Sequence, residues 1–211
     1  MSHKQIRKVI LIFALIVIVC SCEEKIIKSD IEIITEKENA EVATGLKNDT
    51  IILGFYFGMT ESQVLEKFLD LSISKKVYLN NETQFQYDFF FNYPKKATAN
   101  FASEYFQGKL YKMTLILVSE EVSTAMKLLQ LKLIELFNDK YGFFFIKKES
   151  LLRIRNDDFD VIWINGNRKI EIVEGYSDVR IVYTNIIDER EFKRVSEEKE
   201  KLKIEEVIKD I

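Results

Sequence analysis

Residues 58–71 have the sequence GMTESQVLEKFLDL, which follows an apolar run and has the pattern of a helix start. Thr60 and Gln63 have the spacing of a capping box, in which each side chain accepts a hydrogen bond from the backbone N–H of the other residue. The apolar residues after the cap recur at helical spacing: Val64, Leu65, Phe68 and Leu71. This stretch therefore predicts a helix that starts at Thr60, and the apolar residues 51–57 predict a strand before it.

Four segments typical of strands follow this helix, and all are rich in apolar or aromatic residues. They are residues 77–79, 85–93, 97–106 and 110–118. Gln107-Gly108-Lys109 joins the last two and favours a hairpin turn. We therefore expect an antiparallel arrangement of these strands.

The same order of elements recurs in the second part of the chain. A helix is predicted from Ser119 to its C-terminal cap at Gly142. Its apolar residues step by four, three, four and three: Val122, Met126, Leu129, Leu133 and Leu136. Strands are then predicted over residues 143–146, 161–164, 169–173 and 179–184, with a type I′ turn at Asn165-Gly166.

These patterns predict an α+β fold with two helix-plus-antiparallel-sheet halves in one domain, residues 50–187. The halves are residues 50–118 and 119–187. Strands and helices do not alternate, and no Gly-rich loop is present, which argues against dinucleotide-binding and P-loop folds.

The N-terminus has the features of a secretory signal: a basic start, an apolar run from Val9 to Val19, and the small residue Ser21 before a cysteine. The end of this segment, Val-Cys-Ser-Cys, resembles the box that precedes the lipidated cysteine of bacterial lipoproteins. We therefore expect residues 1–21 to be removed and Cys22 to carry lipid. Cys20 fits the box less well, because a bulky valine precedes it. An uncleaved anchor is the alternative, but the apolar run is shorter than the roughly 20 residues of a spanning helix.

Removal of the signal takes away residues on which many enzymes depend. The only histidine, His3, lies in the signal, and Cys22 is consumed by the lipid. Their loss excludes Cys-His and Ser-His-Asp catalysis, zinc sites built on His or Cys, and structural disulfides. Three of the 31 basic residues also leave, so 28 remain against 34 acidic ones, a net charge near −6. With no basic tract in the body, nucleic-acid binding is not expected either, and we expect no catalytic residues, metal or cofactor.

Two polar segments flank the predicted domain. Residues 22–49 are charged and weakly patterned, which is typical of a flexible tether, although Ile31 to Ile33 could add a short strand. Residues 188–211 are dominated by Glu and Lys and predict a charged helix, with Asp188 and Glu191 as a capping pair. A solvated helix held by Glu-Lys pairs is the expectation, and a partner-binding helix is the alternative. The apolar stripe for that alternative consists of Ile204, Val207, Ile208 and Ile211.

The string Gly58-Met59-Thr60-Glu61-Ser62-Gln63-Val64 resembles the opening of the domain of the small-protein-A type outer-membrane lipoproteins, which starts with Gly-Met-Thr-x-x-Gln-Val. The repeated helix-then-sheet unit is similar to the fold of the β-lactamase inhibitor protein. The chain departs from the lipoprotein family after the helix, where Leu69-Asp70-Leu71-Ser72 replaces a Leu-Gly-x-Pro turn. The resemblance implies an outer-membrane lipoprotein that acts by binding, and it transfers no catalytic residue.

One predicted strand carries a row of aromatic residues with period two. On a strand, alternate residues share one face. The row consists of Phe85, Tyr87, Phe89, Phe91 and Tyr93, and Phe90 lies on the opposite face. The row predicts a sheet face buried under a helix, since large aromatic residues usually supply core area. The alternative is an exposed platform for a glycan, peptide or lipid, with Tyr87 and Tyr93 as first contacts. An aromatic on each face suggests a central strand.

An acidic segment and the single tryptophan are two further candidate sites. Asn156, Asp157, Asp158 and Asp160 offer oxygen ligands for calcium, but the glycine and glutamate of a calcium loop are absent, so an acidic turn is expected. Trp163 lies beside a predicted hairpin, where packing is expected and recognition of a ligand is the alternative.

The sequence therefore predicts a non-enzymatic lipoprotein of the bacterial cell envelope that binds other proteins. The anchor places it on a membrane, and the resemblance suggests the outer membrane and a role in its assembly or maintenance. Two alternatives remain: a lipoprotein that binds a glycan, peptide or lipid through the aromatic strand, and an inhibitor of an extracellular enzyme.

Overall fold

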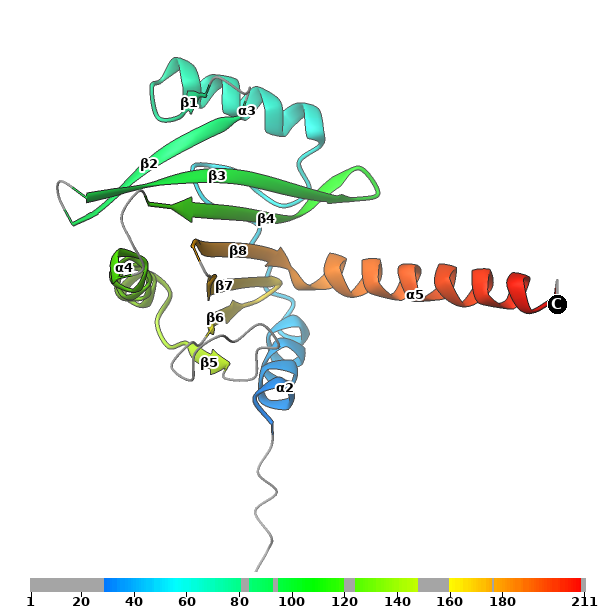
Figure 1. The fold of residues 1–211 in the computed structure, drawn as a ribbon. Helices are drawn as coiled ribbons and strands as arrows, with labels where there is room; N and C mark the ends of the chain where they lie inside the picture. The colour runs from blue at the N-terminus through cyan, green and yellow to red at the C-terminus, as the bar shows by residue number, and fades with distance from the viewer. Residues whose placement is uncertain are drawn as a thin grey trace, which may run out of the picture.

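The computed structural model describes residues 29–80, 84–92, 95–119, 124–147, 160–175 and 177–209 (Figure 1). In these residues the chain forms four helices and one antiparallel sheet of eight strands, which confirms the predicted α+β class. The helices are α2 (Asp30–Ala43), α3 (Glu61–Ile73), α4 (Thr124–Tyr141) and α5 (Ile186–Lys209). The strands are β1 (Tyr78–Leu79), β2 (Phe85–Asn92), β3 (Lys95–Phe106), β4 (Lys109–Val118), β5 (Phe145–Lys147), β6 (Asp160–Asn165), β7 (Arg168–Glu174) and β8 (Val179–Asn185).

The sheet contains the two predicted halves side by side. Its strand order is β1-β2-β3-β4-β8-β7-β6-β5, so the last strand of each half pairs with the last strand of the other. At the middle of this pairing, Leu115 of β4 lies opposite Ile181 of β8. One sheet thus unites α3 with strands β1–β4 and α4 with strands β5–β8.

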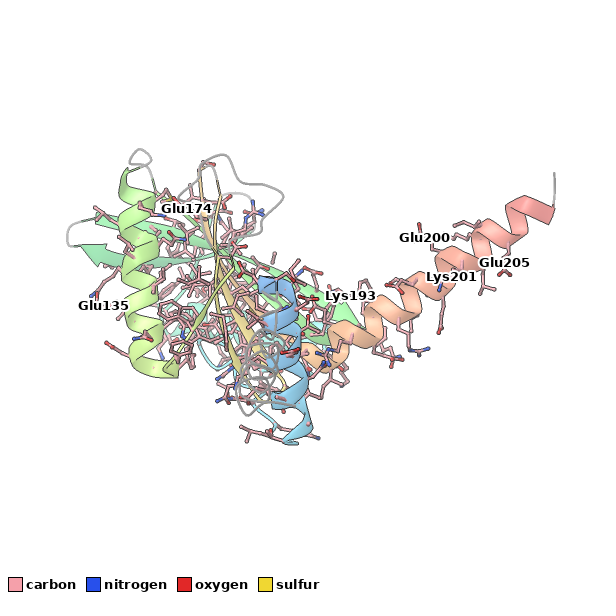
Figure 2. All side chains as sticks on the ribbon, turned by 90° about the horizontal axis from the view of Figure 1, so that it is seen from below. Glu135, Glu174, Lys193, Glu200, Lys201 and Glu205 are labelled. Carbon is pink, nitrogen blue, oxygen red and sulfur yellow. The ribbon has the colours of Figure 1, made fainter. Side chains whose placement is uncertain are left out.

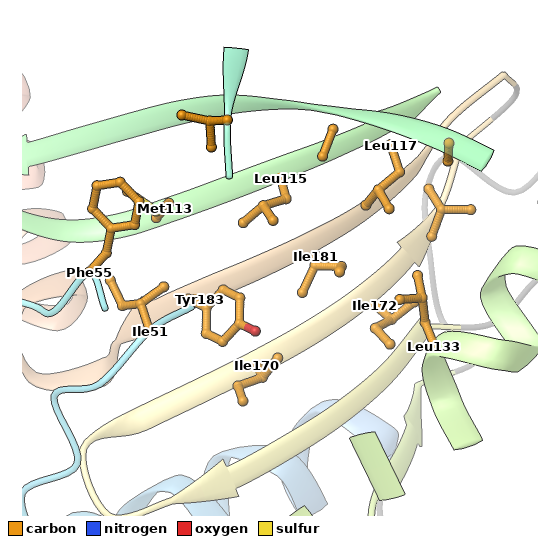
Figure 3. Packing of buried hydrophobic residues seen from close by; sticks show 14 of the residues in the cluster. Ile51, Phe55, Met113, Leu115, Leu117, Leu133, Ile170, Ile172, Ile181 and Tyr183 are labelled. Atoms are coloured by element: carbon orange, nitrogen blue, oxygen red, sulfur yellow. The ribbon is translucent and has the colours of Figure 1, made fainter. Parts of the chain in front are cut away.

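Helices α3 and α4 pack on the same face of the sheet, and the main core lies beneath them. The capping box that begins α3 is confirmed, since Thr60 and Gln63 each accept the other's backbone N–H. Figure 3 shows the core side chains of β4, β8 and β7 in one layer, with Leu133 of α4 against them. Full burial of each such aliphatic side chain contributes about 1.5–3 kcal/mol.

The segment before α3 crosses the core instead of joining the sheet, so the strand predicted over residues 51–57 is wrong. A turn at Leu53, whose φ is +55°, reverses the chain, and only an isolated bridge joins Thr50 to Tyr56. Phe55 is fully buried in the main core. The apolar run therefore fills the core without forming a strand.

Helix α2 lies on the opposite face of the sheet, against β5 and β6. Ile34 packs there with Ile162, Ile164 and Ile186 in a second, smaller cluster. Residues 30–43, which the sequence analysis assigned to the tether, thus form a packed helix, and the short strand expected at Ile31 to Ile33 is wrong. Ser29 and Glu32 form the capping box that starts this helix.

Helix α5 continues directly from β8 and extends away from the body (Figures 1 and 2). Asn185 caps it by accepting hydrogen bonds from the N–H groups of Ile187 and Asp188. The helix therefore starts two residues before the expected capping pair of Asp188 and Glu191. No described helix is long and apolar enough to span a bilayer.

Candidate functional site

The sheet face opposite the main core is open over β2, β3, β4 and β8, and we call this surface the outer face. Apart from Thr184, which lies opposite Lys112 at the margin of this surface and is buried, its side chains are half-buried or exposed, whereas the alternate residues of β4 and β8 on the other side are buried. The outer face consists of Gln86, Asp88, Phe90, Thr98, Asn100, Ala102, Glu104, Lys112, Thr114, Ile116, Val118, Arg180 and Val182. Helix α2 contacts the other end of the sheet, at β5 and β6, and leaves this surface free.

The middle of the outer face carries small and aliphatic side chains. Ala102, Thr114 and Val182 lie opposite one another on three adjacent strands. Ile116 lies in the next row, between Asn100 and Arg180. These four side chains give the surface an uncharged strip that is bordered by Arg180 of β8, which pairs with Asp178 at 3.0 Å.

One end of the outer face is closed by a polar network around Asp88. Its carboxylate pairs with Lys96 at 2.9 Å and accepts hydrogen bonds from Tyr78 at 2.8 Å and Thr98 at 3.3 Å. Burial alone would raise the pKa of Asp88, but these hydrogen bonds outweigh it and hold the pKa below its usual value. Asp88 is therefore a fixed negative charge at neutral pH.

The other end of the outer face carries an ion pair and lies beside the first turns of α5. Glu104 pairs with Lys112 at 2.8 Å and accepts a hydrogen bond from Tyr111 at 3.0 Å. Burial, together with this contact, raises the pKa of Tyr111 to about 12. Phe192 of α5 stacks on Tyr111 and meets Phe106 edge-on, with ring centroids 5.5 and 5.9 Å apart. The helix thus leaves the body beside the β3–β4 hairpin (Figure 1).

A cluster of charges, which we call the Lys169 cluster, joins β7 to α2 and α5. The Nζ atom of Lys169 lies 3.3 Å from Glu38 of α2, 3.5 Å from Glu171 and 3.4 Å from Glu189 of α5. Burial would lower the pKa of Lys169, but the three carboxylates outweigh it and raise the pKa above its ordinary value. Every charge in this cluster contacts an opposite one, so the arrangement holds elements together and does not resemble a reactive site.

The aromatic row of β2 faces the main core, as the packing interpretation predicted. Phe85 stacks on Phe68 of α3 with centroids 4.7 Å apart, and Tyr87 and Phe89 pack against the same core. Tyr87 is half-buried there and forms no exposed platform. Strand β2 is second from the edge of the sheet and not central, and Phe90, which is 58% exposed, is its aromatic on the outer face.

Trp163 also lies in the core, with only 2% of its surface exposed. Its Nε1–H donates to the carbonyl of Gly142 at 3.0 Å, which ties β6 to the end of α4. The packing interpretation of this residue fits the structure, and a ligand on the surface could not reach the indole.

The remaining predicted site residues lie far from the outer face or outside the described residues. Ile204 is 53% exposed on the distal part of α5, and Val207 and Ile208 lie on the same helix, without described side chains. Cys22, Tyr93 and Ile211 lie outside the described residues, as do residues 156–158 of the acidic segment. Asp160 is buried at the start of β6. In the part of the chain that the structure describes, no group of three or more His, Cys, Asp or Glu residues could hold a metal ion.

The sequence contains a signal for the outer face that the sequence analysis did not use. From Ala97 to Glu104 and from Lys112 to Val118, alternate residues are mostly polar or small, and they pair with each other across β3 and β4. This period-two pattern is typical of a sheet with one solvated face.

Comparisons of the chain with protein-family models, curated proteins and solved structures gave no match.

Proposed function

We propose that this protein is a non-enzymatic, lipid-anchored protein of the bacterial envelope, and that it binds another protein through the outer face. The supporting observation is an open surface with an uncharged middle and charged ends on a sheet whose other face holds the main core. Protein interfaces commonly combine a desolvated centre with a polar rim. Cys22 is the proposed attachment point of the lipid, and a role in outer-membrane assembly or maintenance is the context that the family resemblance suggests.

The size of the outer face suggests that α5 takes part in the same interface. Four strands spaced about 4.8 Å apart, over about seven residues of 3.4 Å each, give a surface of about 450 Å². Stable protein complexes bury about 800 Å² on each partner. Helix α5 is about 36 Å long at 1.5 Å per residue and leaves the body at the Glu104 end of the outer face. A partner on the outer face could therefore gain the missing area by contacting α5.

Site-specific photo-cross-linking in cells tests this proposal. A photoreactive amino acid replaces Thr114 in the middle of the outer face, and a second variant carries it at Glu135, which is exposed on α4. We expect the Thr114 probe to capture a defined envelope protein that the Glu135 probe does not capture.

A charge substitution then shows whether the captured contact uses the outer face. Ala102→Arg places a long cationic side chain in the middle of this surface, and Ser62→Arg places the same side chain at an exposed position of α3. Ala102→Arg should abolish cross-linking from Thr114, and Ser62→Arg should leave it intact. Equal capture from both probes, or equal behaviour of both arginine variants, contradicts the proposal.

A further inference from the structure

Helix α2 is fastened to the sheet by both apolar and charged contacts. Ile34 is buried in the second cluster, against Ile162 and Ile164 of β6. Glu38 contacts Lys169 at 3.3 Å and Arg190 of α5 at 3.1 Å. The helix is therefore part of the body, and the chain enters the body at Ser29.

The segment between α2 and the core is held by the β6–β7 turn. The Gly166 N–H donates to Glu41 at 3.0 Å, and the Asn167 Nδ2 donates to Asp49 at 2.7 Å. The Arg168 side chain donates to the carbonyl of Thr50 at 2.8 Å. These bonds leave no freely hinged linker between α2 and the domain.

We propose that the lipid anchor holds the body against the bilayer surface, with the first turn of α2 and the β5 edge facing the lipid. This inference rests on the proposed lipidation of Cys22. Seven Cα–Cα steps separate Cys22 from Ser29, and they reach at most about 25 Å. A tether that extended to residue 50 would reach about 100 Å by the same measure.

The position of α2 decides which edge of the body faces the bilayer. Helix α2 lies on the β5 side of the sheet, and α3 packs at the opposite end of the sheet, where its Phe68 contacts Phe85 of β2 and Phe101 of β3 (Figure 1). Eight strands at about 4.8 Å spacing place these two edges about 34 Å apart. The β5 edge is therefore close to the lipid whenever Cys22 is anchored, and α3 is distant from it.

The side chains at this edge suit contact with an uncharged lipid surface. Phe143, two residues before β5, is 85% exposed, and Ile31, Ile33 and Ile146 are also exposed. Apolar side chains gain free energy at the headgroup boundary of a bilayer. The first turn of α2 also carries two acidic residues, which disfavour anionic lipid. The expected surface is thus a zwitterionic bilayer.

Distance-dependent quenching tests the proposed orientation. The acylated protein that begins at Cys22 has no free thiol, because Cys20 leaves with the signal, so a single introduced cysteine can carry a fluorophore. Phe143→Cys labels the β5 edge, and Leu69→Cys labels an exposed position on α3. In phosphatidylcholine vesicles that contain headgroup spin-labelled lipid, we expect quenching several-fold stronger at position 143 than at position 69. Equal quenching at the two positions overturns the inference.

A spacer variant tests whether the short reach of the chain causes this orientation. A Gly/Ser insert of about 20 residues after Glu24 raises the r.m.s. reach from about 15 Å to about 29 Å. Quenching at position 143 should then fall to the level at position 69, and unchanged quenching overturns the inference. Mass spectrometry of the same samples separates the two proposals. Acylated protein without the quenching difference refutes the orientation alone, and protein without lipid on Cys22 refutes the anchor itself.

Discussion

Replacing Lys169 by methionine should destabilise the body, because this lysine joins three elements of the fold. Its side chain is only 11% exposed and lies within 3.5 Å of carboxylates on α2, β7 and α5. Methionine keeps most of the volume and removes the cation, so three mutually repelling carboxylates remain. Glu38 retains Arg190, and Glu189 retains Lys193 at 3.3 Å, which limits the loss.

The size of the effect follows from the burial of the cluster. Removing one partner of a buried ion pair costs about 3–5 kcal/mol, and an exposed pair contributes about 0–1 kcal/mol. The carboxylates here are 13–19% exposed and two retain other cations, so we expect the free energy of unfolding to fall by about 2–3 kcal/mol. With a urea m-value of about 2 kcal/mol/M, the unfolding midpoint should move down by about 1–1.5 M.

Urea unfolding of residues 23–211, followed by the fluorescence of Trp163, measures this change. Trp163 is the only tryptophan and is buried, so its emission should shift when the core opens. Lys112→Met is the matched control, since Lys112 pairs with Glu104 at 2.8 Å on the same sheet but in a more exposed setting. Its loss should stay under about 1 kcal/mol. If Lys169→Met costs no more than Lys112→Met, the Lys169 cluster does not hold α2 and α5 in place.

Three further predictions concern the fastening of the helices. Gly166→Ala should lower the free energy of unfolding more than Gly108→Ala does. An alanine at either position would adopt a positive φ, which costs about 1–2 kcal/mol, but only at Gly166 would the new Cβ meet a backbone carbonyl oxygen, that of Leu46 at 2.3 Å. Equal unfolding midpoints in urea would contradict this prediction. The pKa of Glu41 is lowered by its bonds to the lysine one turn earlier and to the Gly166 N–H, so its contribution to stability is present above its unfolded pKa and is lost as pH falls. Amide-exchange protection of α2, corrected for intrinsic rates, should therefore decrease from pH 6 to pH 3.5, and constant protection would exclude this role. Phe192→Ala should lower the free energy of unfolding by about 1–2 kcal/mol, since the ring is only partly buried. The substitution should also speed amide exchange in the first turns of α5. Unchanged exchange there would show that the ring does not anchor the helix.

The elements that the sequence predicted correctly are those whose signals are local. The cap of α3 and most of the stripes of α3 and α4 involve residues three or four apart, although Leu65 and Leu136 are exposed and Val122 lies outside the described residues. The two tight hairpins involve neighbours in sequence, but the type I′ turn expected at Asn165-Gly166 is wrong, because the turn residues are Gly166 and Asn167 and only Gly166 has a positive φ. Such patterns need no knowledge of what the element packs against. The pairing of β4 with β8 has no local signal, because it depends on two segments more than 60 residues apart.

The wrong strand at residues 51–57 and the assignment of residues 30–43 to the tether have a common physical origin. The apolar residues around Phe55 resemble a buried strand, but a short apolar run has no period that separates a strand from a core-crossing turn. Helix α2 has only one buried side chain, Ile34, and its other contacts with the body include the half-buried Val42 and the carboxylates of Glu38 and Glu41. A helix fastened by charges resembles a polar linker in sequence, because its partners Lys169 and Gly166 are distant along the chain.

The outer face could be read from the sequence only in part. The alternation along β3 and β4 shows that one side of these strands is solvated. It does not show that β8 extends the same surface, or that α2 leaves it open. The aromatic row of β2 was the stronger sequence signal, yet Phe85 and Tyr87 pack in the core. Large aromatic residues indicate where area is buried on folding, and smaller residues such as Ala102 and Thr114 line the surface that remains.

The proposed function depends on one difference between the two halves of the sheet, which is what covers the face opposite the main core. Both halves bury the same face, so both would leave the same opposite face open. In the second half, α2 packs on that face at β5 and β6, and Glu38 and Glu189 cover Lys169 of β7. In the first half, α5 contacts only one end of that side, where Phe192 meets Phe106 and Tyr111, and the middle of β3 and β4 is half-buried or exposed among the described residues. The terminal helices thus make a repeated architecture asymmetric, because one half of the sheet is covered on this side by α2 and the other half is largely open. Under our proposals, the covered half faces the anchor and the open half binds the partner.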